Sequence, residues 1–167
     1  MAGILVQNSI LKQAEAQIEK QLAPEVRQNY MKIVVAGMKL ALNKGSQGLL
    51  ATLKASKDPL NDIVKGAIGI VGFLRRESKG AMPVKAMVPA AFALVLQGLD
   101  MAEKVGVLEV TKEVLAEATQ AFLEEITHVM GLTPESMQGL ATKVQGVMGD
   151  PAKMNQLKQA GAQNGIA

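Results

Sequence analysis

The sequence predicts an all-α protein, on three observations. Apolar residues recur at helical spacing along most of the chain, and no stretch shows the sustained alternation that is typical of a half-buried strand. Aromatic residues, which are enriched in strands, make up only 2% of the chain. Proline follows a capping side chain, which is typical of a helix start, at Asp58-Pro59, Thr133-Pro134 and Asp150-Pro151. We therefore expect a compact or elongated bundle of about seven or eight helices joined by short turns.

Each expected helix combines an apolar stripe with a start or stop signal. In the first, Ile and Leu recur every seven residues, and the cleanest stripe runs from Val107 to Val129 and ends at a glycine. We expect helices over about residues 3–23, 24–43, 49–53, 59–76, 82–105, 107–131, 134–147 and 151–159. They are predicted to form one helical domain over residues 1–159, followed by a flexible C-terminal tail over residues 160–167.

The composition excludes most kinds of catalytic and metal site. The chain has no Cys, which rules out disulfides, thiol catalysis and Cys-ligated zinc or iron–sulfur centres. Its single His, in Glu125-Ile-Thr-His128, matches the Glu-x-x-His of di-iron bundles, but those sites need two such motifs. No Ser has a base near it in the sequence, and the Gly-rich stretch at 45–48 lacks the Lys of a phosphate loop. We therefore predict that the protein is not an enzyme, with no catalytic residue, metal ligand or cofactor.

Charge is divided unevenly along the chain. Residues 26–99 carry 11 Lys and Arg against three Asp and Glu, a net charge of +8, whereas residues 100–135 carry two against eight, a net charge of −6. Two interpretations are open. The charges are either ordinary solvated helix faces, or complementary surfaces that pair within the fold or head-to-tail between copies. The second interpretation predicts a homo-oligomer.

An unbroken apolar run of 11 residues extends from Ala86 to Leu96. A membrane-spanning helix needs about 20 apolar residues, so this run is too short to span a bilayer alone. It is interpreted either as a central helix that is buried on all sides, or as a segment that enters a membrane in one state, with Lys85 and Asp100 at the water boundaries. The candidate membrane or subunit contacts in this run are Val88, Phe92, Leu94, Val95 and Leu96.

Three further candidate contacts, Gly66, Gly69 and Gly72, lie within one expected helix. Each costs about 1 kcal/mol relative to Ala in a helix that is exposed to water. That cost is offset where another helix packs closely against the glycines. A contact inside the core and a contact with a membrane or another subunit are both open.

A candidate basic patch surrounds the end of the same helix. It consists of Lys65, Arg75, Arg76, Lys79 and Lys85. Positive charge is sufficient to attract phosphate groups, whereas binding of single-stranded bases also uses aromatic side chains, and only Phe73 is close in the sequence. The patch therefore predicts contact with anionic membrane or nonspecific contact with nucleic acid, and no sequence-specific binding.

Three stretches are similar in style to a known class of protein: Ile33-Val-Val-Ala-Gly-Met-Lys39, Val88-Pro-Ala-Ala-Phe-Ala-Leu-Val-Leu-Gln-Gly-Leu-Asp100 and Gly131-Leu-Thr-Pro-Glu135. In composition and style, most of the chain resembles the small internal virion proteins of short-tailed bacteriophages. The resemblance implies an Ala-, Gly- and Met-rich helical protein that is packed near the portal. It also implies that the protein is ejected with the genome and forms part of a channel through the host envelope.

The composition agrees with that expectation, because an ejected protein has to unfold to pass a narrow tube and this chain has no disulfide and few aromatic residues. We predict a non-enzymatic structural protein that oligomerises through amphipathic helices, located in the virion and then in the host cell envelope. Its expected partners are further copies of itself, other virion or assembly proteins, and anionic membrane. The alternative is a soluble helical adaptor or scaffold protein in the cytoplasm, with no membrane role.

Overall fold

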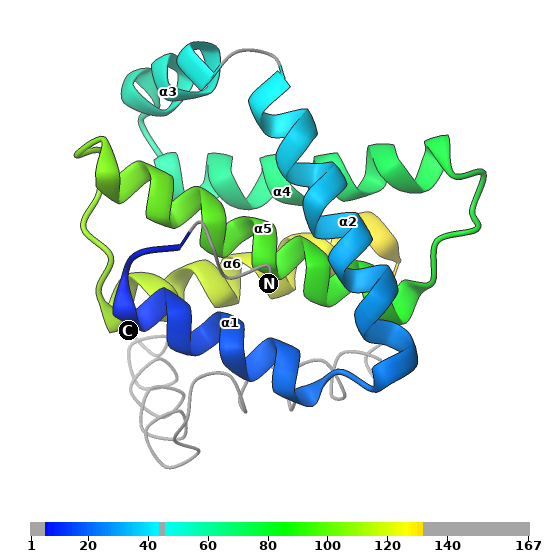
Figure 1. Ribbon diagram of the computed structural model, residues 1–167. Helices are drawn as coiled ribbons and strands as arrows, with labels where there is room; N and C mark the ends of the chain where they lie inside the picture. Colours follow the sequence, from blue (N-terminus) through cyan, green and yellow to red (C-terminus); the bar gives the residue numbers. More distant parts are fainter. Residues whose placement is uncertain (1–5, 44–45, 132–167) are drawn as a thin grey trace, which may run out of the picture.

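The computed structural model describes residues 6–43 and 46–131, and most of them lie in helices (Figure 1). The helices are α1 (Ser9–Gln21), α2 (Pro24–Asn43), α3 (Ser46–Ala55), α4 (Pro59–Glu77), α5 (Val84–Lys104) and α6 (Lys112–Met130). No strand occurs within these ranges, and the all-α prediction is confirmed. The described ranges hold six helices, against seven or eight expected for the chain. The helices predicted over 134–147 and 151–159, and the predicted tail, lie outside the described residues.

Two helices begin later than the sequence predicted, because capping side chains set their starts. α1 begins at Ser9, not near residue 3, since the Asn8 side chain accepts hydrogen bonds from two backbone N–H groups of the first turn. α6 begins at Lys112, after the predicted start in the apolar stripe, since the Thr111 hydroxyl caps it in the same way. In both cases the apolar stripe begins in the segment before the helix, so it does not mark the first helical residue.

The predicted proline and glycine signals are confirmed at other boundaries. Asp58 caps α4, whose first residue is Pro59. Gly131 ends α6 in the left-handed conformation, with φ at 60°. Pro89 lies in the second turn of α5, which continues through it to Lys104.

The helix α5 runs through the centre of the bundle, and α1, α2, α4 and α6 all contact it (Figure 1). α3 contacts α2 and α4 at the edge. Fourteen of the 21 residues of α5 are buried, most of them apolar. Phe92 of α5 packs against Phe122 of α6 with the ring centroids 5.1 Å apart. The hydrophobic core is thus built around α5.

Two glycines allow neighbouring helices to approach closely. A Cβ atom at Gly37 of α2 would lie 2.6 Å from Cδ1 of Leu94 on α5. A Cβ atom at Gly98 of α5 would lie 2.6 Å from Cγ2 of Ile63 on α4. Because both distances are shorter than carbon atoms tolerate, a larger residue at either position would push two core helices apart.

We expect Gly98→Val to destabilise the protein by about 1–3 kcal/mol, because its side chain needs the space that Ile63 fills. Gly69→Val is the matched control, since a Cβ atom at Gly69 of α4 meets nothing within 4 Å. The control is expected to raise stability by a few tenths of a kcal/mol, about the difference in helix propensity. Urea unfolding followed by circular dichroism measures both variants. Equal effects would contradict the close packing of α4 on α5.

Candidate functional site

The predicted membrane or subunit contacts on α5 lie inside the fold. All five, Val88, Phe92, Leu94, Val95 and Leu96, are buried. By length and composition, α5 is the one helix in the described part of the chain that is long and apolar enough to cross a membrane, but most of it is enclosed by the other helices. Of the two interpretations of this apolar run, a buried central helix or a segment that enters a membrane, the described fold agrees with the first. Contact with lipid or with another copy requires the surrounding helices to move away from it.

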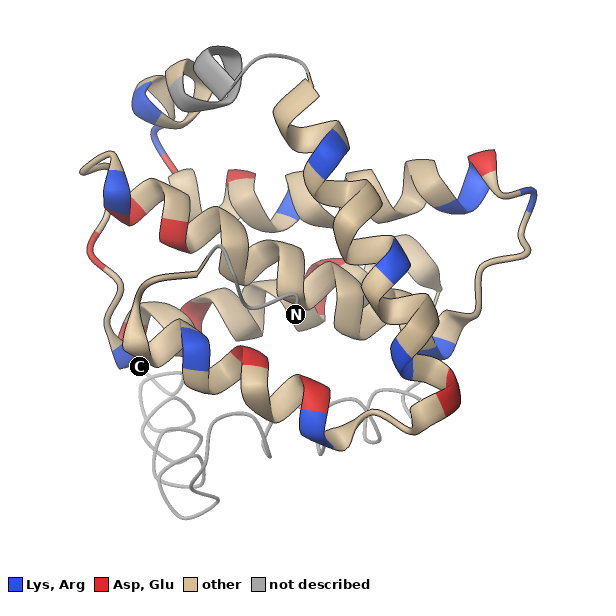
Figure 2. Ribbon diagram, viewed as in Figure 1, with Lys and Arg blue, Asp and Glu red and all other residues tan. Residues whose placement is uncertain are grey.

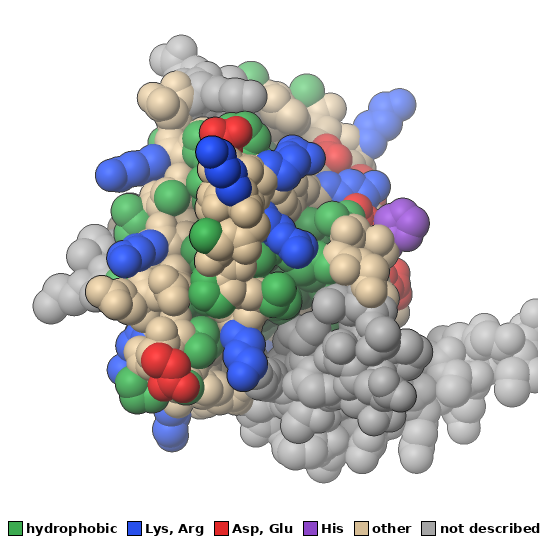
Figure 3. Space-filling model, turned by 90° about the vertical axis from the view of Figure 1, so that its right-hand side faces the viewer, with side chains coloured by type: hydrophobic (Ala, Val, Ile, Leu, Met, Phe, Trp, Pro, Cys, Tyr) green, Lys and Arg blue, Asp and Glu red, His purple; other side chains and the backbone are tan. Residues whose placement is uncertain are grey.

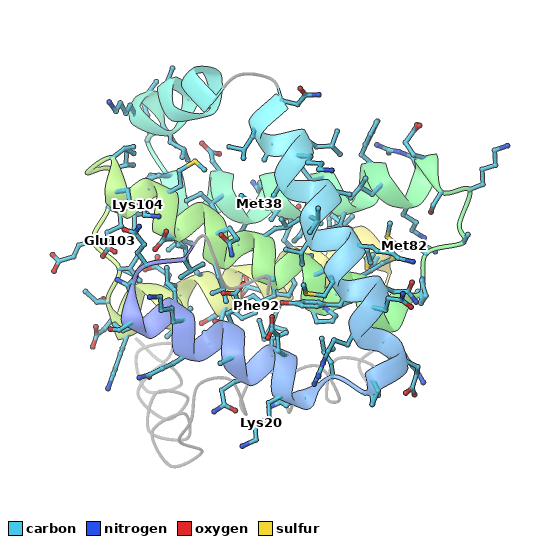
Figure 4. All side chains as sticks on the ribbon, in the orientation of Figure 1. Lys20, Met38, Met82, Phe92, Glu103 and Lys104 are labelled. Atoms are coloured by element: carbon cyan, nitrogen blue, oxygen red, sulfur yellow. The ribbon has the colours of Figure 1, made fainter. Side chains whose placement is uncertain are left out.

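Polar contacts attach the start of α1 to the end of α5. Asp100 Oδ1 accepts hydrogen bonds from the backbone N–H groups of Gln7, at 2.8 Å, and Asn8, at 3.0 Å. Its Oδ2 atom lies 2.6 Å from Nζ of Lys104, and the side-chain amide of Asn8 donates to Oε2 of Glu103 at 2.8 Å. Figure 4 shows Glu103 and Lys104 at this end of α5, beside the first turn of α1. One carboxylate therefore satisfies two backbone groups at the beginning of a helix.

Asp100 is only 3% exposed, yet its environment favours the ionised form. Burial raises the pKa of its carboxyl group, but the ion pair with Lys104 and the two backbone N–H groups outweigh burial, so that the pKa lies below its usual value. The sequence placed Asp100 at the water boundary of a membrane segment. In the fold it is a buried anchor for α1.

A second polar contact joins the middle of α1 to α5. Gln97 Nε2 donates to Oε1 of Glu15 at 3.1 Å, and both side chains are buried. Burial, with the neighbouring carboxylates of Glu19 and Asp100, raises the pKa of Glu15 and outweighs the hydrogen bond from Gln97. On α2 the hydroxyl group of Tyr30 is buried without a hydrogen-bond partner among the described residues. This part of the core therefore holds polar groups at a cost to stability.

We expect Glu15→Gln to stabilise the protein by about 1 kcal/mol at neutral pH, because Gln keeps the oxygen that accepts from Gln97 and removes the buried charge. The pKa of Glu15 is raised in the folded protein, so the fold favours the protonated carboxyl group. The stability that this preference supplies is fully present below the pKa of Glu15 in the unfolded chain, and it is lost as pH rises through the pKa in the folded protein. Thermal unfolding from acidic to neutral pH should show a smaller loss of stability in the variant than in the wild type. Glu109→Gln, at an exposed position of the connection to α6, is the control. A variant that is less stable than the wild type at neutral pH would contradict this account.

The outer side of α4 is flat and partly apolar. A Cβ atom at Gly66, Gly69 or Gly72 would meet nothing within 4 Å, so the interpretation of these glycines as contacts inside the core is wrong. Their cost to helix stability is not offset within the described part of the fold. Phe73 is 42% exposed and, four residues after Gly69, lies on the same side of the helix. No close contact within the described part of the core accounts for these glycines, and their contact with a membrane or another subunit stays a prediction.

The five residues of the predicted basic patch are all exposed. Four of them, Arg75, Arg76, Lys79 and Lys85, lie where α4 ends and α5 begins, and Lys65 lies about three turns earlier on α4. Across residues 6–43 and 46–131, none of them forms a salt bridge. Figure 3 views the molecule from this side and shows basic side chains with hydrophobic ones between them. The exposed hydrophobic residues include Phe73 and Val84. The structure thus brings four of the five patch residues and apolar surface to one end of the bundle.

Acidic residues line the outer side of α6. Glu113, Glu117, Gln120 and Glu124 are all exposed and recur every three or four residues, so that they share one side of the helix. We name these four residues the acidic ridge. Figure 2 shows acidic positions along α6 and basic positions along α2 and at the end of α4. The salt bridge between Asp100 and Lys104 lies within α5, and among the described residues no basic side chain forms a salt bridge with the ridge.

The described ranges contain no group of three or more His, Asp or Glu side chains that could hold a metal ion. The Glu125 and His128 pair lies near the end of α6, with His128 exposed. What the fold does bring together is a set of surfaces and helix anchors.

Sequence reasoning missed the buried polar anchors. Glu15 lies between Leu11 and Ile18 on the apolar stripe of the first helix. Gln97 and Asp100 lie one turn apart on a helix that is otherwise apolar there. A polar residue within an apolar stripe is the signal in the sequence from which these contacts could have been predicted.

No protein-family model, curated protein or solved structure matched the chain.

Proposed function

We propose that the protein is a non-enzymatic structural protein that self-associates through the outer faces of its helices. The observation that carries the proposal is the separation of charge on the surface. Exposed basic side chains gather on α2 and at the α4 end, exposed acidic side chains line α6, and the described residues form a single salt bridge, between two residues of α5. Because these opposite charges do not pair with one another among the described residues, they are available to a second copy.

Sedimentation velocity tests the proposal. At micromolar concentration and low salt, we expect species larger than the 17.6 kDa monomer. The species should dissociate as the salt concentration rises, because a shorter Debye length weakens exposed charge pairs. A monomer at every salt concentration, in both buffer and detergent, would contradict self-association.

Within this function we propose the role of a virion protein that leaves with the genome and forms part of a channel across the host envelope. The resemblance in composition to internal virion proteins supports this role, as does a helix, α5, of sufficient length and apolarity. Because α5 is enclosed, entry into a membrane requires α1 and the other neighbours to separate from it. The partners are then other virion proteins and anionic lipid, with nonspecific contacts to nucleic acid through the basic patch.

The alternative is a soluble helical adaptor or scaffold protein in the cytoplasm, and the burial of α5 favours it. Flotation with anionic liposomes, together with release of an enclosed dye, decides between the two roles. A channel component should float with the liposomes and release the dye. Protein that stays at the bottom of the gradient and leaves the liposomes intact supports the adaptor role.

A further inference from the structure

We propose that the outer face of α4 in one copy binds the acidic ridge of α6 in a second copy, with the two helices antiparallel. The inference rests on the proposed self-association and names the surfaces that carry it. We define the α4 face by the residues from Lys65 to Arg76 on the outer side of the helix: Lys65, Gly66, Gly69, Gly72, Phe73 and Arg76; the exposed carboxylate of Asp62 lies one turn before it.

Charges on the two surfaces have the same spacing. Lys65 and Arg76 stand 11 residues apart on α4, and Glu113 and Glu124 stand 11 residues apart on α6. Eleven residues are about three turns of helix, or roughly 16 Å, so each pair lies on one side of its helix. Both cations of the α4 face can therefore meet both end carboxylates of the ridge at the same time.

The direction of pairing follows from the next charged residue on each helix. If Lys65 faces Glu124 and Arg76 faces Glu113, the helices are antiparallel, and equal steps along both helices place Glu77 opposite Lys112. In the parallel alignment, Glu77 stands opposite a carboxylate, that of Glu125. Like charges facing each other are unfavourable, so the antiparallel arrangement is the one that the charges support.

The three glycines fit the same contact. In the antiparallel alignment Gly69 faces Gln120 and Gly72 faces Glu117, the two middle residues of the ridge. Because no side chain of the described residues covers α4 at these positions, the backbone of a second helix can approach it closely. Phe73, which is exposed in the single copy, then stands opposite Ala116 and gains an apolar neighbour. The contact accounts for the cost of the glycines and for the exposed Phe.

The two surfaces are unlike, so the contact is heterologous. Each docked copy has an α4 face and an acidic ridge, and the contact can repeat until a ring closes. A single pair of helices buries less area than a stable dimer usually does, so one contact is expected to be weak and dependent on salt. Repetition of the contact around a ring supplies the additional stability.

Charge reversal tests the pairing. Lys65→Glu alone and Glu124→Lys alone are each expected to weaken association about tenfold or more, since an attractive pair becomes a repulsive one. An equimolar mixture of the two variants should restore association, because the carboxylate introduced at position 65 of one variant then meets the ammonium group introduced at position 124 of the other. Lys12→Glu, the same change at an exposed position of α1 outside both surfaces, is the matched control. Sedimentation velocity at low salt measures all four samples, and circular dichroism checks that each variant is folded.

A steric variant gives an independent readout. Gly69→Leu fills open space in the single copy, so the melting temperature should be unchanged or higher, while association weakens.

If the wild type associates but neither charge reversal nor Gly69→Leu affects it, the interface is wrong and the proposed function stands. Loss of association without recovery in the mixture also overturns the pairing. A wild type that stays monomeric overturns both proposals. If Lys65→Glu leaves association intact and abolishes binding to anionic vesicles, the α4 face belongs to lipid instead.

Discussion

Leu94→Asp is expected to unfold the protein. Leu94 lies in the middle of α5, is 5% exposed, and packs where Gly37 brings α2 closest to α5. An aspartate there has no cation beside it, so either an unpaired charge or a desolvated acid is placed in the core, in addition to the packing that the leucine loses. The combined cost, roughly 4 kcal/mol or more, is comparable with the entire stability of many domains.

Circular dichroism at 222 nm and a thermal melt measure this effect. Val35→Asp provides the control, because Val35 is exposed on the neighbouring helix α2. That change should alter stability by no more than about 0.5 kcal/mol. A Leu94→Asp variant with a melt like that of the wild type would show that α5 is not the centre of the fold.

Asp100→Ala is expected to destabilise the protein by about 2–4 kcal/mol and to loosen α1. The change removes the acceptor of two backbone N–H groups and leaves the Lys104 side chain without its carboxylate. In the variant, amide hydrogen exchange should become faster over residues 6–12 and should change less in α5. Glu109→Ala, at an exposed position of the connection to α6, is the control and should have little effect.

The wild type should also lose stability in acid through this residue. The pKa of Asp100 is lowered in the folded protein, so its contribution is present above the unfolded pKa and is lost as pH falls through the folded value. The variant lacks this contribution and should show a flatter response in the acidic range. Identical acid profiles for the wild type and Asp100→Ala would show that the carboxylate does not stabilise the attachment of α1.

The helical fold could be predicted from the sequence because its signals are local. The spacing of apolar residues, the proline after Asp58 and the glycine at 131 each depend on a few neighbouring residues, and the structure agrees with them. The starts of α1 and α6 could not be read from apolar spacing, since the stripe extends past the caps at Asn8 and Thr111. Capping side chains decided both boundaries.

The surfaces were predictable only in part, because they depend on contacts between distant residues. The sequence showed that residues 26–99 are basic and 100–135 acidic, but not whether the two sets pair within one copy. Nor did it show that Gly66 lies on an open side of its helix while Gly98 lies against Ile63. Both glycines stand in apolar stretches of similar composition. Which neighbours they meet is decided by the packing of α4 on α5.

Cross-linking of a mixture of unlabelled and ¹⁵N-labelled protein tests the central claim most directly. A carbodiimide joins a lysine to a carboxylate only when the two side chains are in contact, and mass spectrometry then identifies the isotope of each peptide. The account predicts cross-links between Lys65 and Glu124 that combine one labelled with one unlabelled peptide, and that disappear at high salt. Two results would contradict the assembly of copies through α4 and α6. In the first, the Lys65–Glu124 cross-links join only peptides with the same labelling; in the second, the protein is associated but forms no Lys65–Glu124 cross-link.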